Sequence, residues 1–280
     1  MHIVLGATGH IGSHLVAALS GAGESVIAVV RDGAKAAALA GPSIEVAVAD
    51  IRATETLRSL FQRGQRAFLL NPPGDPTGDS NADELATGQS IAAALERSGL
   101  EKVVLASTYG AQPGDAIGDL STLYQLERAV ETSGIPAAIN RAAYYFTNLD
   151  MLLEPAGQGI LPTAFPAEFV LPMVAPADIA AFAAERLLSS VDDSGVRYIE
   201  GPARYSFADV AKAFAAKLGH PVEVQTTPRE QWAESFRAIG FSDVASRSFA
   251  AMTGATLDAP DLPDDPARGG VTLTEYINAI

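Results

Sequence analysis

A glycine-rich segment near the amino terminus has the residue types and spacing to bind a diphosphate. Gly6-Ala7-Thr8-Gly9-His10-Ile11-Gly12 follows a short apolar run, His2–Leu5, and leads into a helical pattern, Ile11–Leu19. Glycines at such a turn let a pyrophosphate approach backbone amides, and the amino end of the helix adds partial positive charge. A glycine-rich turn without a ligand is the alternative. The predicted diphosphate-binding residues are Gly6, Thr8, Gly9, His10, Ile11 and Gly12.

A second strand-like run, Ser25–Val30, ends at a residue that can distinguish between cofactors. Arg31 follows it directly, where the adenosine ribose of a bound dinucleotide is expected. A guanidinium there can bind a 2′-phosphate through two hydrogen bonds. Asp32, one residue later, is the type of carboxylate that accepts hydrogen bonds from the ribose of NAD. We expect NADP(H) as the cofactor, with a solvated surface charge as the other interpretation of Arg31.

The third and fourth predicted strands end in residues that can contact the rest of the cofactor. Asp50 and Ile51 can flank the adenine, and Asn71, Pro72 and Pro73 lie where the ribose and pyrophosphate are expected. Ordinary strand-terminating turns explain each of these residues equally well.

Aromatic residues follow the fifth and sixth predicted strands, where a flat substrate can stack over a nicotinamide. The candidates are Tyr109, Tyr144, Tyr145 and Phe146, of which Tyr109 and Tyr144 are also the candidate catalytic residues. Asn148 can orient a substrate oxygen or cap the next helix. A core at the junction between domains is the alternative explanation for the four rings.

The elements that must position these residues follow the pattern of parallel strands joined by crossover helices. We therefore predict an α/β fold, a Rossmann-type doubly wound parallel sheet. The ligand edge of such a sheet carries the loops Pro72–Asn81 and Tyr109–Asp119. The predicted strands are His2–Leu5, Ser25–Val30, Ile44–Ala49, Ala67–Asn71, Lys102–Ser107, Ala137–Asn140 and Tyr198–Glu200. The predicted helices are Ile11–Leu19, Ala34–Leu39, Thr54–Phe61, Ala82–Ser98, Leu120–Ser133, Asp178–Leu188, Ser206–Leu218, Arg229–Ile239 and Thr274–Ile280.

The pattern changes after Arg141 to aromatics and then to a proline-punctuated stretch, Leu161 to Pro176. We predict that residues 1–150 form an NADP-binding domain, with 175–202 returning to its sheet. Residues 151–174 and 203–280 are predicted to form a smaller lobe that caps the substrate.

Composition excludes several classes of function. With 19 basic and 33 acidic side chains, the formal charge of −14 disfavours nucleic acid and anionic lipid as partners. Cysteine is absent, no Gly-x-Ser-x-Gly elbow occurs, and the four histidines lack the spacing of a metal triad. We see no signal peptide and no apolar run of membrane length. We expect a cytoplasmic monomer or homodimer without a metal.

Together these residues resemble the NmrA-like branch of the atypical short-chain dehydrogenase/reductase family, over almost the whole chain. The resemblance implies an NADP(H)-binding Rossmann domain with a smaller lobe closing a substrate cleft, and it adds Ser107 and Thr108 to the cofactor site. That branch includes NAD(P)H-dependent quinone and azo-compound reductases. The segments that carry the resemblance are Gly6–Gly12, Val29–Asp32, Ala49–Asp50, Val104–Thr108, Leu126–Glu127, Ser133–Pro136, Arg141 with the aromatics and Asn148 after it, and Asp178–Ala180.

One part of the family pattern is missing. Classical members use a Tyr-x-x-x-Lys pair, in which lysine lowers the tyrosine pKa. Here Arg128 stands four residues after Tyr124, and Glu127, where many NmrA-like members carry lysine, stands four after Leu123. We expect hydride transfer from NADPH to a small quinone-like or aromatic acceptor, because such an acceptor needs less from the protein than orientation. The alternative is a non-catalytic NADP(H)-binding redox sensor that acts through a protein partner.

Overall fold

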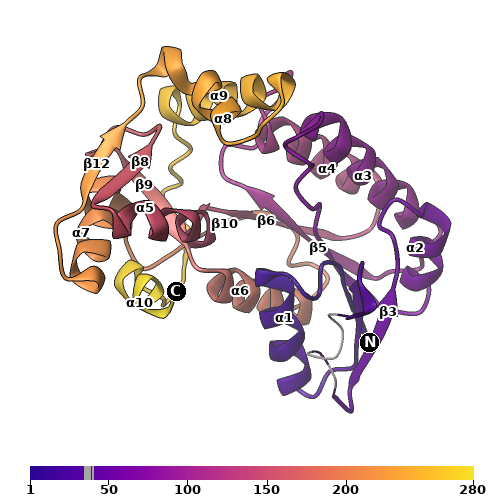
Figure 1. Cartoon of the computed structure of the whole chain (residues 1–280). Helices are drawn as coiled ribbons and strands as arrows, with labels where there is room; N and C mark the ends of the chain where they lie inside the picture. The colour runs from indigo at the N-terminus through magenta and orange to yellow at the C-terminus, as the bar shows by residue number, and fades with distance from the viewer. Residues whose placement is uncertain (35–38, 40) are drawn as a thin grey trace.

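The computed structural model describes residues 1–34, 39 and 41–280. Its centre is an eight-stranded sheet in which every neighbouring pair of described strands is parallel (Figure 1). The predicted doubly wound α/β sheet is therefore confirmed. In their order across the sheet, the strands are β13 (Ala267–Arg268), β10 (Gly195–Glu200), β6 (Ala137–Ala142), β5 (Lys102–Thr108), β4 (Arg66–Leu69), β1 (His2–Val4), β2 (Val26–Val30) and β3 (Ile44–Val48).

Helices cover both faces of this sheet because the strands are apolar on both sides. On one face lie α1 (His10–Gly21) and α6 (Pro176–Leu188), and on the other lie α2 (Thr54–Phe61), α3 (Ser80–Leu95) and α4 (Asp119–Thr132) (Figure 1). Central strands such as β2 and β5 are buried almost throughout, as parallel strands between two helical layers must be. The predicted helix Ala34–Leu39 falls mostly on residues outside the described part of the chain.

The order of the strands places a ligand crevice at one edge of the sheet. The chain moves outward from β1 through β2 to β3 and then returns to the other side of β1 with β4. The loops after β1 and β4 therefore diverge, and the carboxyl ends of these strands border an open crevice. The glycine-rich turn follows β1, and the loop 70–79 follows β4, so that the last two residues of the predicted loop Pro72–Asn81 belong to α3.

A smaller lobe has its own apolar core, in which aromatic side chains pack among aliphatic ones. Phe146, Phe207 and Phe214 are buried in it. Its helix α7 begins at a capping box in which Ser206 and Asp209 bind each other's backbone amides. The elements of the lobe are β7 (Tyr144–Tyr145), a 3-10 helix (Phe146–Leu152), α5 (Leu153–Gly157), β8 (Ile160–Thr163), β9 (Val170–Val174), β11 (Arg204–Ser206), α7 (Phe207–Leu218), β12 (Glu223–Thr226) and α10 (Leu273–Ala279).

A helical hairpin, α8 (Trp232–Ala238) and α9 (Asp243–Asp258), follows the lobe and extends over the loops after β4 and β5 (Figure 1). The predicted helix Arg229–Ile239 is divided into a 3-10 turn, Arg229–Gln231, followed by α8. The helix α9 was not predicted from the sequence.

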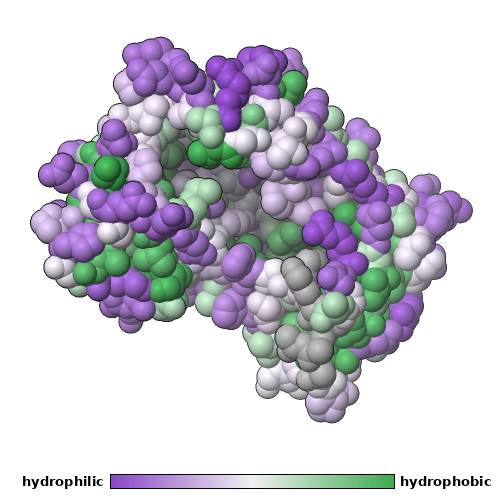
Figure 2. Space-filling model, in the orientation of Figure 1, coloured by the Kyte–Doolittle hydropathy of each residue, from purple (hydrophilic) through white to green (hydrophobic). Residues whose placement is uncertain are grey.

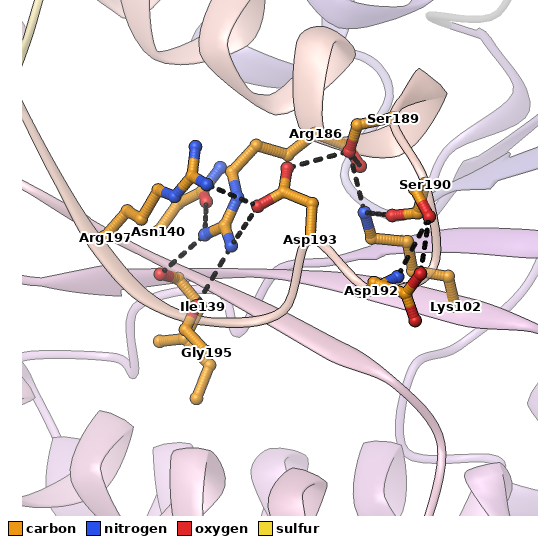
Figure 3. A network of polar contacts seen from close by, with 10 residues as sticks. All are labelled: Lys102, Ile139, Asn140, Arg186, Ser189, Ser190, Asp192, Asp193, Gly195 and Arg197. Atoms are coloured by element: carbon orange, nitrogen blue, oxygen red, sulfur yellow. Dashed lines mark hydrogen bonds and ion pairs between the residues drawn. The ribbon is translucent and has the colours of Figure 1, made fainter.

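A buried polar network fixes the opposite, amino edge of the sheet (Figure 3). Lys102 and Arg186 are both 0% exposed. Lys102 Nζ donates to Ser189 Oγ at 2.9 Å, and Arg186 donates to Asn140 Oδ1 at 2.9 Å and to Asp193 Oδ1 at 3.2 Å. These contacts join the end of α6 to β5 and β6, so this network stabilises the return of the chain into β10.

None of the helices in the described part of the chain has the length and apolar character needed to cross a membrane.

Candidate functional site

The glycine-rich turn has the geometry of an anion-binding helix start. Gly6 adopts φ +65°, and the Gly9 N–H donates to the Gly6 carbonyl at 2.9 Å. A Cβ on Gly12 would lie 2.1 Å from that same carbonyl oxygen, so only glycine fits there. α1 begins at His10 with no side chain capping it and no acidic residue in its first turn. The first-turn amides can therefore bind an anion. Thr8, Gly9 and His10 are exposed, and Ile11 and Gly12 are buried.

Charged residues at the ends of β2 and β3 lie beside this turn. The carboxylates of Asp32 and Asp50 each accept a hydrogen bond of 2.9 Å from the backbone N–H two residues later, so both stabilise local turns. Arg31 is exposed at the end of β2. Ile51 packs against the core under α2 and α3. Arg31 is thus on the surface where a 2′-phosphate is expected, while the Asp32 carboxylate already accepts a hydrogen bond within its own turn.

The end of β4 carries an unsatisfied hydrogen-bond acceptor. Asn71 Nδ2 donates to the Glu84 carbonyl at 3.0 Å, while its Oδ1 is buried and has no partner among the described residues. A buried acceptor without a donor costs free energy, so a ligand hydroxyl or a water is expected there. Half-buried Pro72 and exposed Pro73 follow it.

The end of β5 is occupied by a buried ion pair. Glu127, 0% exposed, accepts hydrogen bonds from Arg141 Nε at 3.0 Å and Nη2 at 2.8 Å. Ser107 Oγ donates to the same carboxylate at 2.5 Å. The hydroxyl of Ser107 is therefore committed to the ion pair, and half-buried Thr108 is the nearer of the two to the crevice surface.

Tyr109 also follows β5, and its hydroxyl forms a hydrogen bond with a buried carboxylate. It donates to Glu200 Oε1 at 3.0 Å, and its ring packs edge-on against Tyr198 with the centroids 5.0 Å apart. Burial, and then the negative charge of Glu200, raise the pKa of Tyr109 above its ordinary value. Tyr109 is thus a weaker acid than a free tyrosine.

The other predicted acceptor-binding residues separate into two groups. Tyr144 and Tyr145 are half-buried, whereas Phe146 is fully buried in the core of the smaller lobe. Burial raises the pKa of Tyr144 to about 12, an effect opposed by a hydrogen bond with exposed Asn148. Burial also raises the pKa of Tyr145, and the charge of Asp119 adds to this effect. Phe146 thus supports the lobe, and Tyr144, Tyr145 and Asn148 have accessible surface.

Two carboxyl groups that sequence reasoning missed lie where the loops after β4 and β5 meet. Glu84 Oε1 accepts the Gly74 N–H at 3.0 Å, and its Oε2 accepts the Thr122 hydroxyl at 2.7 Å. Burial and the neighbouring Asp119 raise the pKa of Glu84 to about 7, and burial raises the pKa of Asp119. No sequence signal identified this pair, because an acidic residue within a helix usually faces solvent.

Ser248 of α9 joins these two loops, a contact that the sequence also did not predict. Its Oγ accepts the Gly118 N–H at 3.0 Å and exchanges hydrogen bonds with the side chain of Asn81 at 2.8 and 3.1 Å. Nearby, Ser242 Oγ donates to the Gly78 carbonyl at 2.6 Å. The hairpin of α8 and α9 thereby connects the smaller lobe to the ligand edge of the sheet.

Figure 2 shows this side of the molecule hollowed between the smaller lobe and the sheet domain, beneath α8 and α9. Apolar surface lines the upper rim of the hollow, which suits a ligand with aromatic groups. Within the described residues, no group of three or more His, Asp or Glu side chains is placed to hold a metal ion.

Comparisons with known proteins agree with this architecture. The NAD(P)H azoreductase of Xenophilus azovorans is 25% identical over 291 residues, covering 100% of this chain and 97% of that protein. The structure of the NADPH-dependent quinone oxidoreductase of Escherichia coli complexed with NADPH superposes with a TM-score of 0.79 at 22% identity, covering 100% of this chain and 99% of that one. The triphenylmethane reductase of Citrobacter sp. complexed with NADP(H) gives a TM-score of 0.80 at 20% identity, with the same coverage.

The model of the NmrA-like family matches residues 2–255, which include the glycine-rich turn, the Glu127–Arg141 pair and the hydrogen-bonded Ser248. The match thus extends from the nucleotide crevice through the smaller lobe into α9. This chain belongs to the NmrA-like family.

Proposed function

We propose that this protein is an NADPH-dependent reductase of small quinone-like or aromatic acceptors. The observation that carries the proposal is the uncapped amino end of α1, held by the Gly6–Gly12 turn, with Arg31 exposed at the neighbouring strand end. This arrangement suits a dinucleotide diphosphate with a phosphorylated ribose. The names of the relatives, a NAD(P)H azoreductase and an NADPH-dependent quinone oxidoreductase, support the same function.

The residues around the crevice fit such a cofactor. The absence of a Cβ at Gly12 lets the Gly6 carbonyl pack directly against the start of α1. The buried Oδ1 of Asn71 can accept a hydrogen bond from a ribose hydroxyl. The proposed cofactor-binding residues are Gly6, Thr8, Gly9, His10, Ile11, Gly12, Arg31, Asp50, Ile51, Asn71, Pro72, Pro73, Ser107 and Thr108. Ser107 acts through its backbone, because its hydroxyl is bound to Glu127.

A bound NADPH supplies the hydride, and we assign to this chain the orientation of the acceptor. Tyr109, Tyr144 and Tyr145 provide half-buried rings beside the crevice, and Asn148 provides an amide. Since the pKa of each tyrosine is raised, the proton that completes the reduction comes from solvent rather than from a tyrosine. Tyr109 and Tyr144, the candidate catalytic residues, therefore act by contact with the acceptor. Phe146 does not belong to this surface.

Steady-state oxidation of NADPH with a panel of quinones and azo compounds tests the proposal. We expect turnover with at least one conjugated acceptor and none with simple aliphatic ketones, since these need an acid catalyst. Tight NADPH binding without turnover of any acceptor would reject the reductase assignment.

A redox sensor is the second candidate, and the Glu127–Arg141 pair favours it because this pair leaves no Tyr-Lys acid at the end of β5. A sensor predicts different affinities for NADP⁺ and NADPH and a protein partner whose binding depends on the cofactor. Equal affinities for the two forms would reject this candidate.

We also propose a cytoplasmic monomer or homodimer that does not bind nucleic acid directly. The acidic balance, with a formal charge of −14, supports the last point. Sedimentation velocity tests the oligomeric state, and an electrophoretic shift assay with duplex DNA tests the absence of nucleic-acid binding.

A further inference from the structure

Glu200, at the end of β10, is a fully buried carboxylate with an unusually complete set of donors. It is 0% exposed. Arg204 Nε and Nη2 approach its oxygens at 2.9 and 2.7 Å, and Arg268 Nη1 lies at 2.7 Å. Tyr109 Oη is a further donor, at 3.0 Å. The two arginines compensate the buried carboxylate, which also accepts the hydrogen bond of the phenol.

Tyr109 is restrained from several sides by this arrangement. Its hydroxyl points to Glu200, and its ring packs edge-on against Tyr198 with an interplanar angle of 80°. The backbone after it is fixed by Asp261, whose Oδ2 accepts the Gly110 N–H at 3.1 Å. The ring of Tyr109 therefore has one orientation, set by residues of β10 and of the carboxy-terminal loop.

We propose that Glu200 is a positioning residue that holds the phenol of Tyr109 away from the acceptor, so that Tyr109 offers its ring and not its proton. This inference rests on the proposed reductase function. It explains how a tyrosine directly after β5 is excluded from proton transfer: the hydroxyl donates its single proton to a carboxylate and has none left for a substrate oxygen. Burial and the charge of Glu200 raise the pKa of Tyr109, in agreement with this arrangement.

The arginines contribute to the same function from the smaller lobe and the sheet edge. The side chains of Arg204 and Arg268 are 27% and 45% exposed, so water screens part of their charge. Arg204 belongs to β11, and Arg268 to β13. The orientation of Tyr109 thus depends on contacts from outside the nucleotide crevice.

Two substitutions separate positioning from acid catalysis. In Tyr109→Phe the ring remains and the hydroxyl is lost, and in Glu200→Gln the charge is lost and an acceptor oxygen remains. We expect each to raise the acceptor KM by about 3- to 10-fold while kcat and its pH profile stay near wild type, since orientation is lost and no proton donor is removed. The double variant should be no worse than the more affected single variant, because both substitutions act on the same contact between Tyr109 and residue 200. Tyr124→Phe, on α4, is the matched control.

Two kinetic outcomes overturn the proposal. One is a fall in kcat of about 100-fold or more in Tyr109→Phe with loss of a pH limb, which is the signature of a general acid. The other is full additivity of the two KM effects in the double variant.

A cofactor-independent measurement distinguishes failure of this inference from failure of the proposed function. In protein labelled with ¹³Cζ-tyrosine, the resonance absent from Tyr109→Phe identifies Tyr109. We expect this resonance not to titrate near the ordinary tyrosine pKa of about 10 in the wild type, and to titrate at lower pH in Glu200→Gln than in the wild type. Ordinary titration of Tyr109 in the wild type would overturn the proposal, even if Glu200→Gln does not fold. Absence of turnover in the wild type would reject only the reductase function.

Discussion

The Glu127 carboxylate and the Arg141 guanidinium form a two-point ion pair, with Arg141 Nη2 at 2.8 Å and Nε at 3.0 Å from the carboxylate oxygens. Glu127 lies on α4, at the position where the family resemblance leads one to expect a lysine. The pair joins α4 to β6 and occupies the place from which a lysine would lower a tyrosine pKa. The ion pair therefore explains why this chain lacks the Tyr-x-x-x-Lys pair that would supply a proton. It also predicts how the site responds to substitution.

Arg141→Leu should strongly destabilise the fold, because it leaves the carboxylate of Glu127 buried and uncompensated. We expect a loss of about 3–5 kcal/mol in the free energy of unfolding, measured by urea denaturation. Glu127→Lys should also destabilise it through repulsion of Arg141, and should not create acid catalysis. The control is Arg128→Ala, which breaks the half-exposed pair with Glu131 and should cost less than about 1 kcal/mol. Equal effects of the two arginine substitutions would contradict this account.

Gly12→Ala should disrupt the turn that binds the diphosphate. The new Cβ would meet the Gly6 carbonyl oxygen at 2.1 Å, and backbone cannot move aside as a flexible side chain can. We expect a loss of about 1–3 kcal/mol or more in stability and no measurable NADPH binding. Gly21→Ala, in the same helix with nothing within 4 Å, is the matched control and should bind NADPH normally. Retention of wild-type affinity by Gly12→Ala would show that the diphosphate binds elsewhere.

Much of the sheet could be predicted because its strands are continuous apolar runs that end at turn residues. Six of the seven predicted strands agree with the structure to within two residues, and β10 starts at Gly195 rather than Tyr198. The helix α9 could not be predicted in this way. Its buried positions are Ala245, Ser246, Ser248 and Thr253, which are small or polar and leave no apolar stripe in the sequence.

The candidate site was partly predictable for the same reason. Gly6 to Gly12 lie together in sequence, so their spacing carries information about one local turn. The partnerships of Glu84 with Asp119, and of Tyr109 with Glu200, join residues far apart in the chain, and only the fold brings them together. The same holds for Phe146, whose neighbours Tyr205 and Tyr276 place it in the core of the smaller lobe.

Glu84→Gln should change how stability depends on pH. In the folded state the pKa of Glu84 is raised from 4.5 to about 7, so the folded protein retains a proton that the unfolded chain releases. The wild type should therefore lose stability as pH rises from about 4.5 to 7, with a constant cost above that. The variant carries no such charge and should be more stable than wild type by about 1–3 kcal/mol at pH 8, with a smaller difference at pH 5.

Thermal unfolding across this pH range measures the effect, with Glu96→Gln, at the exposed end of the same helix, as the control. A difference between Glu84→Gln and wild type that does not vary with pH would show that the carboxyl group ionises normally in the folded state.

Ser248→Ala should loosen the contact between α9 and the loops after β4 and β5. It removes the acceptor for the buried Gly118 N–H and the partner of Asn81, at an expected cost of about 1–3 kcal/mol. NADPH should also dissociate faster in stopped-flow experiments, because α9 connects the loops that border the crevice. Ser235→Ala, on α8, bonds only a carbonyl of its own helix and is the control. An unchanged free energy of unfolding and an unchanged rate of NADPH dissociation in Ser248→Ala would show that these contacts of Ser248 do not hold the two loops.

Calorimetric titration of NADPH and NADH into wild type and Arg31→Ala tests the central claim most directly, with the exposed Arg247→Ala as a control for net charge. A guanidinium bound to a 2′-phosphate contributes about 1.5–3 kcal/mol, or roughly a 10- to 150-fold preference for NADPH. We predict this preference in wild type and in Arg247→Ala, and its loss in Arg31→Ala through weaker NADPH binding alone. Absence of binding by either nucleotide to folded protein, or a preference unaffected by Arg31→Ala, would contradict the account.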